Sequence, residues 1–184
     1  MRDEALANFL NELGAKKPTP GGGAVAGLNG AIAAAQLKMV CEYTEDKTIK
    51  ENIGALGQRT KTFLDLAESD SAVFSKVSEA YKTKDKSRLK TALGEALNPS
   101  REIISICEEL ISFCEVNYAK FNSKLKADLV VSLANLKASV RSAQAMIDTN
   151  LEALESDPKE REENKQYCDD LLERVNKLYK KLGA

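Results

Sequence analysis

The sequence of 184 residues contains no histidine and no tryptophan. Histidine is the most frequent metal ligand in proteins and the most frequent general acid or base. Its absence argues against a histidine-ligated zinc site and against catalysis by a nucleophile–histidine pair. Any acid–base chemistry must therefore come from aspartate, glutamate, lysine, tyrosine or cysteine side chains.

Closely spaced cysteine pairs are also missing. The four cysteines are Cys41, Cys107, Cys114 and Cys168. Without histidine, this spacing predicts no metal site. Free thiols are typical of a reducing compartment, and the first residues, MRDEALANFLNEL, are acidic and amphipathic, unlike a signal peptide. We therefore expect a cytoplasmic protein, with Cys107 and Cys114 serving in packing rather than catalysis.

The chain has no excess of either charge and few aromatic residues. Its 27 basic and 28 acidic side chains give a net charge of −1. A nucleic-acid-binding face would need clustered lysine and arginine, and the lysine-rich run over residues 82–90 is interpreted as a solvated turn. No nucleic-acid partner is predicted. With 5% aromatic residues and only 4 prolines, the composition favours helices over strands.

Apolar residues recur at helical spacing through most of the sequence. The predicted helices span residues 3–14, 22–43, 53–81, 87–116, 125–154 and 158 onward. Asp3 is placed to cap the first helix, and Pro99 should bend or divide the fourth. The side chains expected to point inward from the last helix are Tyr167, Leu171, Leu172, Val175 and Leu178. No strand is predicted, so we expect one all-α domain over residues 1–184, an up-and-down bundle of long antiparallel helices.

A glycine- and alanine-rich run, KPTPGGGAVAGLNGAIAAAQ, covers residues 17–36. It is nearly long enough to span a membrane, but alanine and glycine gain little from leaving water, and Asn29 and Gln36 are polar. No membrane partner is therefore predicted. A phosphate-binding loop would need lysine and serine or threonine after the glycines, whereas Ala24 follows them here. The remaining interpretation is a helix whose small residues allow close packing, in the core or at a dimer interface.

The glycines at the start of this run allow two interpretations. Backbone N–H groups of Gly21, Gly22 and Gly23 are unpaired at a helix start, where they attract anions or polarised carbonyl groups. Alternatively, the glycines form a tight turn that needs positive φ angles. The sequence alone leaves both open.

Several segments resemble the cyclodeaminase/cyclohydrolase family of folate enzymes. The most specific is PTPGGGAVAGLNGAIAAAQLKMV, residues 18–40, and further similarity follows in DSAVF at 70–74, Tyr81-Lys82, ALNPSREI at 96–103 and KADLVVSLANLKASVRSAQAMIDTNL at 126–151. The resemblance spans nearly the whole chain. The sequence departs from the family pattern at four positions, where the family often has serine, glycine, asparagine and serine: Ala24, Phe121, Lys124 and Ala127.

The resemblance implies chemistry at the one-carbon bridge of tetrahydrofolate. The family's cyclohydrolases open the 5,10-methenyl form with water to give the 10-formyl form. Its cyclodeaminases close the 5-formimino form to the methenyl form and release ammonia. Both reactions pass through a tetrahedral carbon and involve an amidinium-type cation, so they need a proton-transfer group and a negative field. A small homodimeric enzyme with a folate substrate and no tightly bound cofactor is implied.

Two aspartates are the candidate catalytic residues. Asp70 lies among apolar residues between Ala67 and Phe74, and Asp128 directly precedes the apolar segment LVVSLANL. A carboxyl group half-buried in such surroundings has a raised pKa and can move a proton near neutral pH. Structural alternatives exist for both: Asp128 as a first-turn residue that stabilises a helix start, and Asp70 as a solvated helix carboxylate.

Further residues are candidates for binding the substrate: Gly21, Gly22, Gly23, Lys38, Tyr81, Arg141 and Asn150. Lys38 would contact the glutamate tail, Tyr81 would stack on a ring, Arg141 would pair with a carboxylate, and Asn150 would bind the pterin edge. The alternatives are ordinary surface contacts, with the Lys38 stem lying along the helix. Cyclohydrolase activity is expected because the chain carries no formiminotransferase domain. Cyclodeaminase activity, and a non-catalytic folate-binding or helical interaction protein, stay open.

Overall fold

The periodic apolar segments are helical in the computed structural model, which describes residues 5–184. The helices are α1 (Ala5–Leu13), α2 (Gly22–Glu42), α3 (Lys47–Lys50), α4 (Ile53–Thr83), α5 (Lys86–Asn117), α6 (Lys126–Ala153) and α7 (Pro158–Leu182), with a 3₁₀ turn, η1 (Ser123–Leu125), before α6. No strand occurs between residues 5 and 184. The predicted all-α class is confirmed, and Asp3, predicted to cap the first helix, lies outside the described residues.

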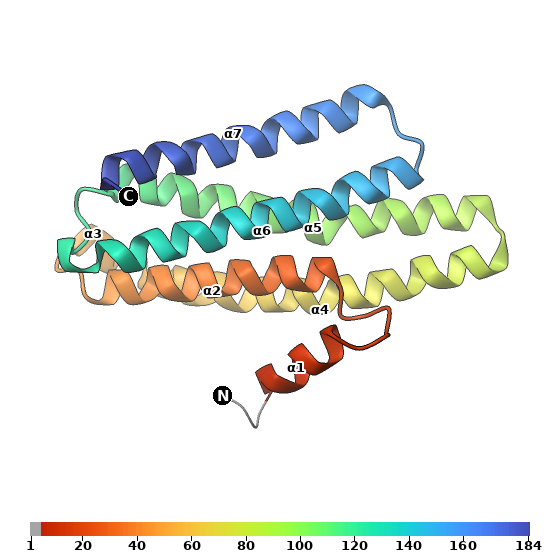
Figure 1. Ribbon diagram of the computed structural model, residues 1–184, viewed down its shortest axis with the longest axis horizontal. Coiled ribbons are helices and arrows are strands. Elements are labelled where there is room, and N and C mark those ends of the chain that lie inside the picture. Colours follow the sequence, from red (N-terminus) through yellow and green to blue (C-terminus); the bar gives the residue numbers. More distant parts are fainter. Residues whose placement is uncertain (1–4) are drawn as a thin grey trace.

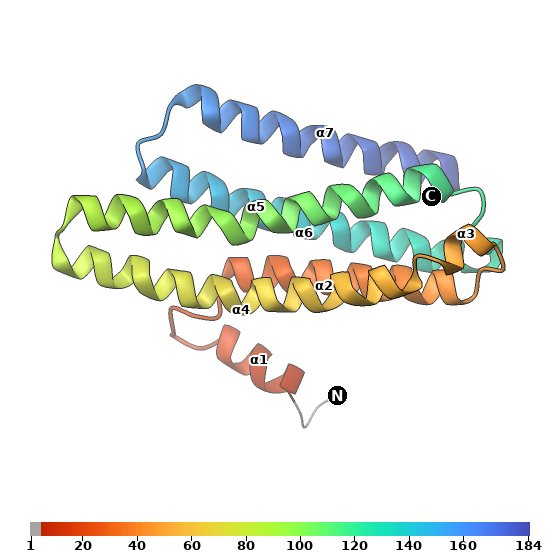
Figure 2. The same ribbon diagram turned by 180° about the vertical axis from the view of Figure 1, so that it is seen from behind.

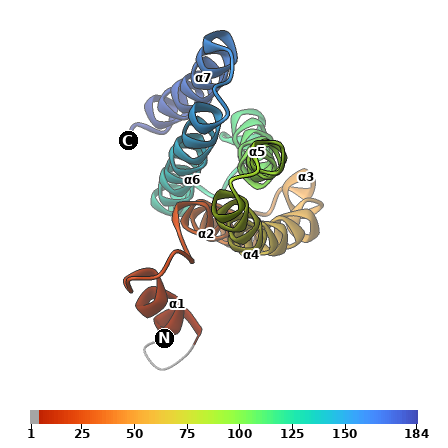
Figure 3. The same cartoon turned by 90° about the vertical axis from the view of Figure 1, so that its right-hand side faces the viewer.

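Four long helices, α2, α4, α5 and α6, form the antiparallel bundle, and α7 packs on α5 and α6 (Figures 1 and 3). Consecutive long helices run in opposite directions, as predicted for an up-and-down bundle. Asp85 and Asp157 begin α5 and α7 by accepting hydrogen bonds from backbone N–H groups of the first turn, which satisfies donors that the helix itself leaves unpaired. Helix α5 continues through Pro99 without dividing, and Figure 2 shows it bending near its middle.

Helix α2 is packed through its small residues. Gly23, Gly27, Gly30, Ala31 and Ala34 are buried. The side chains of Phe63 and Ala67 on α4 lie where side chains at Gly30 and Gly27 would point, so the missing side chains let the two helices approach closely. The predicted close packing therefore occurs in the core, although Ala35, the last residue of the predicted stripe, is exposed.

Hydrogen bonds reinforce the contact of α2 with α6. The buried hydroxyl groups of Ser132 and Ser139 donate to the backbone carbonyls of Ala33 and Ala26, at 2.9 and 2.8 Å. By length and composition α2 would allow a membrane span, but 56% of that stretch is buried within the protein. It serves here as the central helix of the bundle.

All four cysteines are free and buried. Burial raises the pKa of the Cys107 thiol to about 12, so the thiol stays protonated and unreactive near neutral pH. Cys107 and Cys114 are both completely buried in the core, in agreement with the predicted packing role. Within residues 5–184, no three Cys, Asp or Glu side chains come together as a metal-binding group.

One expectation about a helix face was wrong, and one helix lies beside the bundle. Helix α1 has an apolar face, but none of its residues is buried, because it lies beside the bundle at the end of a loop instead of within it (Figures 1 and 3). In α7, Leu171, Leu172, Val175 and Leu178 are buried as predicted. Tyr167 is 40% exposed, because its hydroxyl group donates a hydrogen bond to Glu108 at the surface, at 2.5 Å.

Candidate active site

One end of the bundle is hollow because α2 is shorter than its neighbours. Helix α2 begins at Gly22, beside Asp70 of α4. Helix α4 continues from Asp70 to Thr83, about 20 Å further at roughly 1.5 Å per residue. The space that a longer α2 would fill is partly covered by the loop that contains Pro18 and Thr19, whose Thr19–Pro20 peptide bond is cis. This arrangement leaves a pocket at the start of α2.

The pocket, called the Asp70 pocket below, has a volume of about 260 Å³. Three helices and the glycine loop contribute its walls. Its polar and glycine lining consists of Thr19, Gly21, Gly22, Asp70, Tyr81, Thr149 and Asn150, and its larger apolar lining consists of Val73, Phe74, Val77, Leu93 and Met146. A mostly apolar cavity with a few convergent polar groups is the usual form of a small-molecule site.

Asp70 of α4 lies directly against the start of α2. Gly21, the residue before α2, makes no side-chain capping hydrogen bond; instead the backbone N–H of Ala24 donates to the Asp70 carboxyl group. A side chain at Gly23 would overlap that carboxyl group, so glycine is required for the approach. The three glycines have no positive φ angle, which removes the tight-turn interpretation and leaves close approach as the reason for Gly23.

Burial raises the pKa of the Asp70 carboxyl group, and the hydrogen bond from Ala24 offsets this only in part. A raised pKa makes the carboxylate a better proton acceptor at neutral pH. The start of α2 also carries a partial positive charge that favours the ionised form. The pocket thus contains one partly buried carboxyl group, held against a helix start, that can exchange a proton with a bound molecule.

The structure brings five of the predicted site residues together as lining of this pocket: Gly21, Gly22, Asp70, Tyr81 and Asn150. Gly23 lies directly against Asp70. The Asn150 side-chain amide donates only a long hydrogen bond, 3.5 Å, to the carbonyl of Ala96, so most of its hydrogen-bonding capacity is left for a ligand. Tyr81 stands at the exposed rim.

Three other predicted residues lie elsewhere. Asp128 is in the first turn of α6, about 33 Å from Asn150 at roughly 1.5 Å per residue, and accepts a 2.8 Å hydrogen bond from the Gln36 amide. It therefore does not share a centre with Asp70 within one chain. Lys38 forms a 3.0 Å ion pair with Glu42, one turn further along α2.

Arg141 also lies outside the Asp70 pocket. Its guanidinium group forms a 2.8 Å ion pair with Asp169 of α7 and donates a hydrogen bond to Gln144 at 2.8 Å. These contacts join α6 to α7, which corresponds to the structural alternative considered for this residue. Within one chain, Arg141 does not reach a ligand bound beside Asp70.

Sequence reasoning missed most of the wall that α6 contributes. Met146, Thr149 and Ala153 line the pocket together with Asn150. The Met146 sulfur lies 2.8 Å from where a side chain at Gly22 would begin. These residues are spaced three or four positions apart, so they share one face of α6 with Asn150. Because Asn150 was predicted as a site residue, its helix neighbours on the same face could have been predicted as well.

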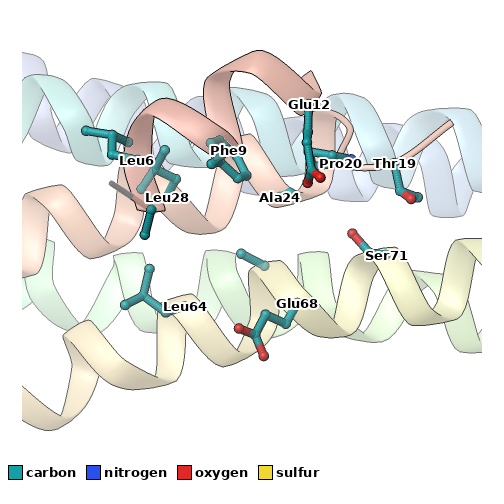
Figure 4. Close-up of a pocket in the computed structure, with 12 residues that line it drawn as sticks. Leu6, Phe9, Glu12, Thr19, Pro20, Ala24, Leu28, Leu64, Glu68 and Ser71 are labelled. Carbon is teal, nitrogen blue, oxygen red and sulfur yellow. The ribbon is translucent and has the colours of Figure 1, made fainter. Parts of the chain in front are cut away.

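A second and larger cleft lies on the other side of the glycine loop. It has a volume of about 560 Å³ and shares Thr19 with the Asp70 pocket. Figure 4 shows Leu6 and Phe9 of α1 facing Leu28 of α2, with Leu64 on α4 opposite. This region, called the α1 cleft below, also contains Glu12, Glu68 and the side chain of Ala24.

Comparison with known proteins identifies the family and supports the fold. The profile of the formiminotransferase-cyclodeaminase family matches residues 5–170. The chain belongs to the formiminotransferase-cyclodeaminase family. A family relative, methenyltetrahydrofolate cyclohydrolase from Methylorubrum extorquens, is 27% identical over 199 aligned positions, which cover 99% of this chain and 92% of the relative. The crystal structure of formiminotetrahydrofolate cyclodeaminase from Thermotoga maritima superposes with a TM-score of 0.84 at 26% identity, over 100% of this chain and 99% of the other.

The glycine-rich segment that resembles the family lies at the Asp70 pocket. Four residues of the family-like segment PTPGGG line the Asp70 pocket: Pro18, Thr19, Gly21 and Gly22. Two departures from the family pattern fall outside this lining. Ala24 faces the α1 cleft, and Ala127 is exposed near the opposite end of α6.

Proposed function

We propose that the protein is a folate one-carbon enzyme that hydrolyses 5,10-methenyltetrahydrofolate to the 10-formyl form in the Asp70 pocket. The observation that carries the proposal is the partly buried Asp70 carboxyl group, held beside the start of α2 in a pocket lined by the family-like glycine motif. The full-length similarity to a methenyltetrahydrofolate cyclohydrolase supports the choice of reaction.

The proposed mechanism uses Asp70 for proton transfer. Its carboxylate accepts a proton from the attacking water as oxygen bonds to the bridge carbon, giving a tetrahedral intermediate. The bond from this carbon to N5 then breaks while N5 receives a proton from Asp70. Loss of the hydroxyl proton completes the formyl group, so one proton is released overall. The negative charge of Asp70 also favours the cationic substrate.

Cyclodeamination is the alternative reaction for the same pocket. The similarity to the Thermotoga maritima cyclodeaminase favours it, and both reactions place a tetrahedral carbon beside the same proton-transfer group. A non-catalytic folate-binding protein was suggested by the missing serines at Ala24 and Ala127. Because neither residue lines the Asp70 pocket, we favour an active enzyme over this second alternative.

Gly21, Gly22, Gly23, Tyr81 and Asn150 are proposed to hold the pterin ring, since they line or border the pocket. No tightly bound cofactor or metal ion is required by the proposed reaction. We also propose that the protein works in the cytoplasm, a compartment that suits its four free and buried thiols. The proposed homodimer is supported by an exposed apolar face on α2 and α4 that includes Ile32 and Leu64.

The proposal is tested by following the methenyl absorbance with both substrates. Wild-type protein is expected to remove the absorbance of 5,10-methenyltetrahydrofolate faster than the uncatalysed reaction, whereas a cyclodeaminase would generate that absorbance from the 5-formimino form. Asp70→Asn should lower turnover by about 10²-fold or more, because general acid–base groups contribute roughly that amount. Asp65→Asn, an exposed carboxylate of the same helix, serves as the matched control and should leave turnover unchanged.

The variant Asp128→Asn tests whether Asp128 takes part in catalysis. Its position near the far end of α6 predicts turnover within about threefold of wild type. A loss as large as that of Asp70→Asn would return Asp128 to the catalytic site, through the partner subunit of the proposed dimer. Turnover of neither substrate by the wild-type protein would remove the proposed function.

A further inference from the structure

The Asp70 pocket shares lining residues with a hollow on each of two sides, and the charged residues of these two hollows differ. Across Thr19 it adjoins the α1 cleft, whose lining includes the carboxylates of Glu12 and Glu68. In the other direction it shares Leu93 and Ala153 with a further hollow of about 260 Å³. That hollow is lined by Lys86, Lys90 and Glu155 together with apolar residues, and is called the Lys86 hollow below.

Helix α5 connects the Asp70 pocket to the two lysines. Lys86, Lys90 and Leu93 follow one another at spacings of four and three residues, so they share one face of α5. From Leu93, which lines the pocket, to Lys86 the helix rises about 10 Å. A ligand that leaves the pocket over Leu93 and Ala153 therefore meets both ammonium groups along a single stripe.

The two lysines are available for an anion. Both are exposed, and neither forms an ion pair in the part of the chain that the structure describes. Nearby charges are already paired: Arg88 contacts Glu79 at 3.3 Å, Lys76 contacts Glu95 at 2.8 Å, and the Asp85 carboxylate accepts the N–H groups of Ser87 and Arg88. Glu155 is the single acidic member of the hollow.

We propose that the Lys86 hollow binds the glutamate carboxylates of the folate substrate, with Lys86 and Lys90 as the residues that recognise them. This inference rests on the proposed function for the identity of the ligand. The pterin end lies beside Asp70, the aminobenzoyl group crosses the apolar wall formed by Leu93 and Ala153, and the anionic tail reaches the lysines. The opposite direction is unfavourable for the tail because the exposed Glu68 carboxylate would repel it. Among the described residues, Glu12 is paired there only with Lys17, at 4.0 Å. Lys38, predicted from sequence to contact the tail, lies too far along α2 to do so in the same chain.

The test is a binding measurement, so that it does not depend on turnover. The affinity of 5-formyltetrahydrofolate, a stable analogue, is measured by calorimetry, and so is that of the matching pteroate that lacks glutamate. The double variant Lys86→Gln, Lys90→Gln should weaken binding of the analogue with the tail on the order of 10-fold, the sum expected for two exposed ion pairs. It should leave the tail-less analogue unchanged, and the loss should shrink as salt is added.

Control variants test whether the glutamate tail lies in the Lys86 hollow or in the α1 cleft. Lys47→Gln with Lys61→Gln removes the same charge from exposed positions on α3 and α4 and should change neither affinity. The inference is overturned if the Lys86 and Lys90 variant binds both analogues as wild type does. It is equally overturned if Glu12→Gln with Glu68→Gln selectively changes affinity for the analogue with the tail.

The outcomes also separate this inference from the proposed function. Tail-dependent binding without turnover of either substrate would contradict the proposed enzyme and support the Lys86 hollow. Normal turnover with no tail dependence of binding would contradict the Lys86 hollow and support the enzyme. If the wild-type protein bound neither analogue, both would be wrong.

Discussion

At the scale of single residues, the Asp70 carboxyl group couples the chemistry of the pocket to stability. Its pKa is raised by burial, so the protonated form is favoured in the folded state. The stability that this contributes is fully present below the unfolded pKa of about 3.9 and is lost as the pH rises through the folded pKa. At neutral pH, the folded protein therefore holds an ionised group in a place that favours a neutral one.

Asp70→Asn is accordingly expected to raise the melting temperature at pH 7 by a few degrees, since about 1 kcal/mol corresponds to roughly 2–4 °C in a domain of this size. Asparagine is neutral and its amide oxygen can still accept from the Ala24 N–H. The gain should shrink as the pH is lowered and Asp70 itself becomes protonated. Thermal unfolding followed by circular dichroism between pH 4 and 8 measures this. A lower melting temperature at pH 7 would mean that the carboxylate acts mainly as a charged cap for α2.

The sequence context could not separate Asp70 from Asp128. Both aspartates stand beside apolar residues, and either pattern is typical of a partly buried carboxyl group. What distinguishes them is tertiary: Asp70 faces the start of α2 and a pocket, whereas Asp128 contacts Gln36 near the other end of the bundle. The position of a residue along its helix is read directly from sequence, but the level at which a neighbouring helix begins is set by packing.

At the scale of helices, the contact between α2 and α4 depends on positions without side chains. A methyl group at Gly27 would lie 2.7 Å from the Phe63 carbonyl oxygen and 2.8 Å from the Ala67 side chain. Backbone atoms of a packed helix cannot move aside without separating the two helices, and overpacking of this kind costs about 1–3 kcal/mol. The stripe of small residues predicted from sequence is therefore a requirement of this one interface.

Gly27→Ala should lower the free energy of unfolding by about 1–3 kcal/mol, measured by urea denaturation. Gly94→Ala is the matched control, because no atom lies within 4 Å of the added methyl group. Since alanine is the better helix former by up to about 1 kcal/mol, Gly94→Ala should stabilise the protein. Equal effects from the two substitutions would show that close packing does not determine the contact.

Helix α7 is attached to α5 by a cluster of charges centred on Arg174. The guanidinium group contacts Glu115 at 2.7 Å and Glu108 at 3.2 Å, and donates to the Ser112 hydroxyl at 2.7 Å. Hydrogen bonding from Arg174 lowers the pKa of Glu115. A lowered folded pKa stabilises the protein above the unfolded value of about 4.3, and this contribution is lost as the pH falls through the folded pKa.

Arg174→Met should therefore reduce the free energy of unfolding by about 1 kcal/mol at pH 7, a value discounted for the partial exposure of the pair. The difference from wild type should narrow as the pH is lowered below about 4. Arg101→Met removes a single, more exposed α5–α7 ion pair with Glu160 and should cost less than about 0.5 kcal/mol. Chemical denaturation at both pH values distinguishes them. A constant loss at all pH values would assign the effect to packing of the arginine stem.

The helices themselves were predictable because each long helix buries one continuous face. The predicted segments for α2, α4, α5, α6 and α7 overlap the observed ones almost throughout, and Pro99 did not end α5. Helix α1 shows the limit of this reasoning. Its apolar residues have helical spacing but remain unburied, because periodicity indicates which face is apolar and not what covers that face.

At the scale of the whole molecule, both the Asp70 pocket and the α1 cleft follow from the way short and long elements are combined. The pocket exists because α2 begins late, and the cleft exists because α1 stands away from the bundle (Figure 1). Two exposed apolar side chains lie on the α2 and α4 side that faces this cleft: Ile32, 44% exposed, and Leu64, 45% exposed. Leu64 lines the cleft, and Ile32 follows the lining residue Leu28 by one turn of α2.

This apolar face is where we expect the proposed homodimer to form. Covering an isoleucine or leucine side chain yields roughly 1.5–3 kcal/mol when burial is complete, and a glutamate placed there would have to be buried without a partner. Ile32→Glu and Leu64→Glu should therefore shift the mass measured by light scattering from twice the 20.1 kDa monomer to the monomer itself. Val116→Glu, at a position on α5 that is 75% exposed, should stay dimeric. A wild-type mass of one monomer, or a dimer that survives both substitutions on the α2 and α4 face, would show that this face is not the interface.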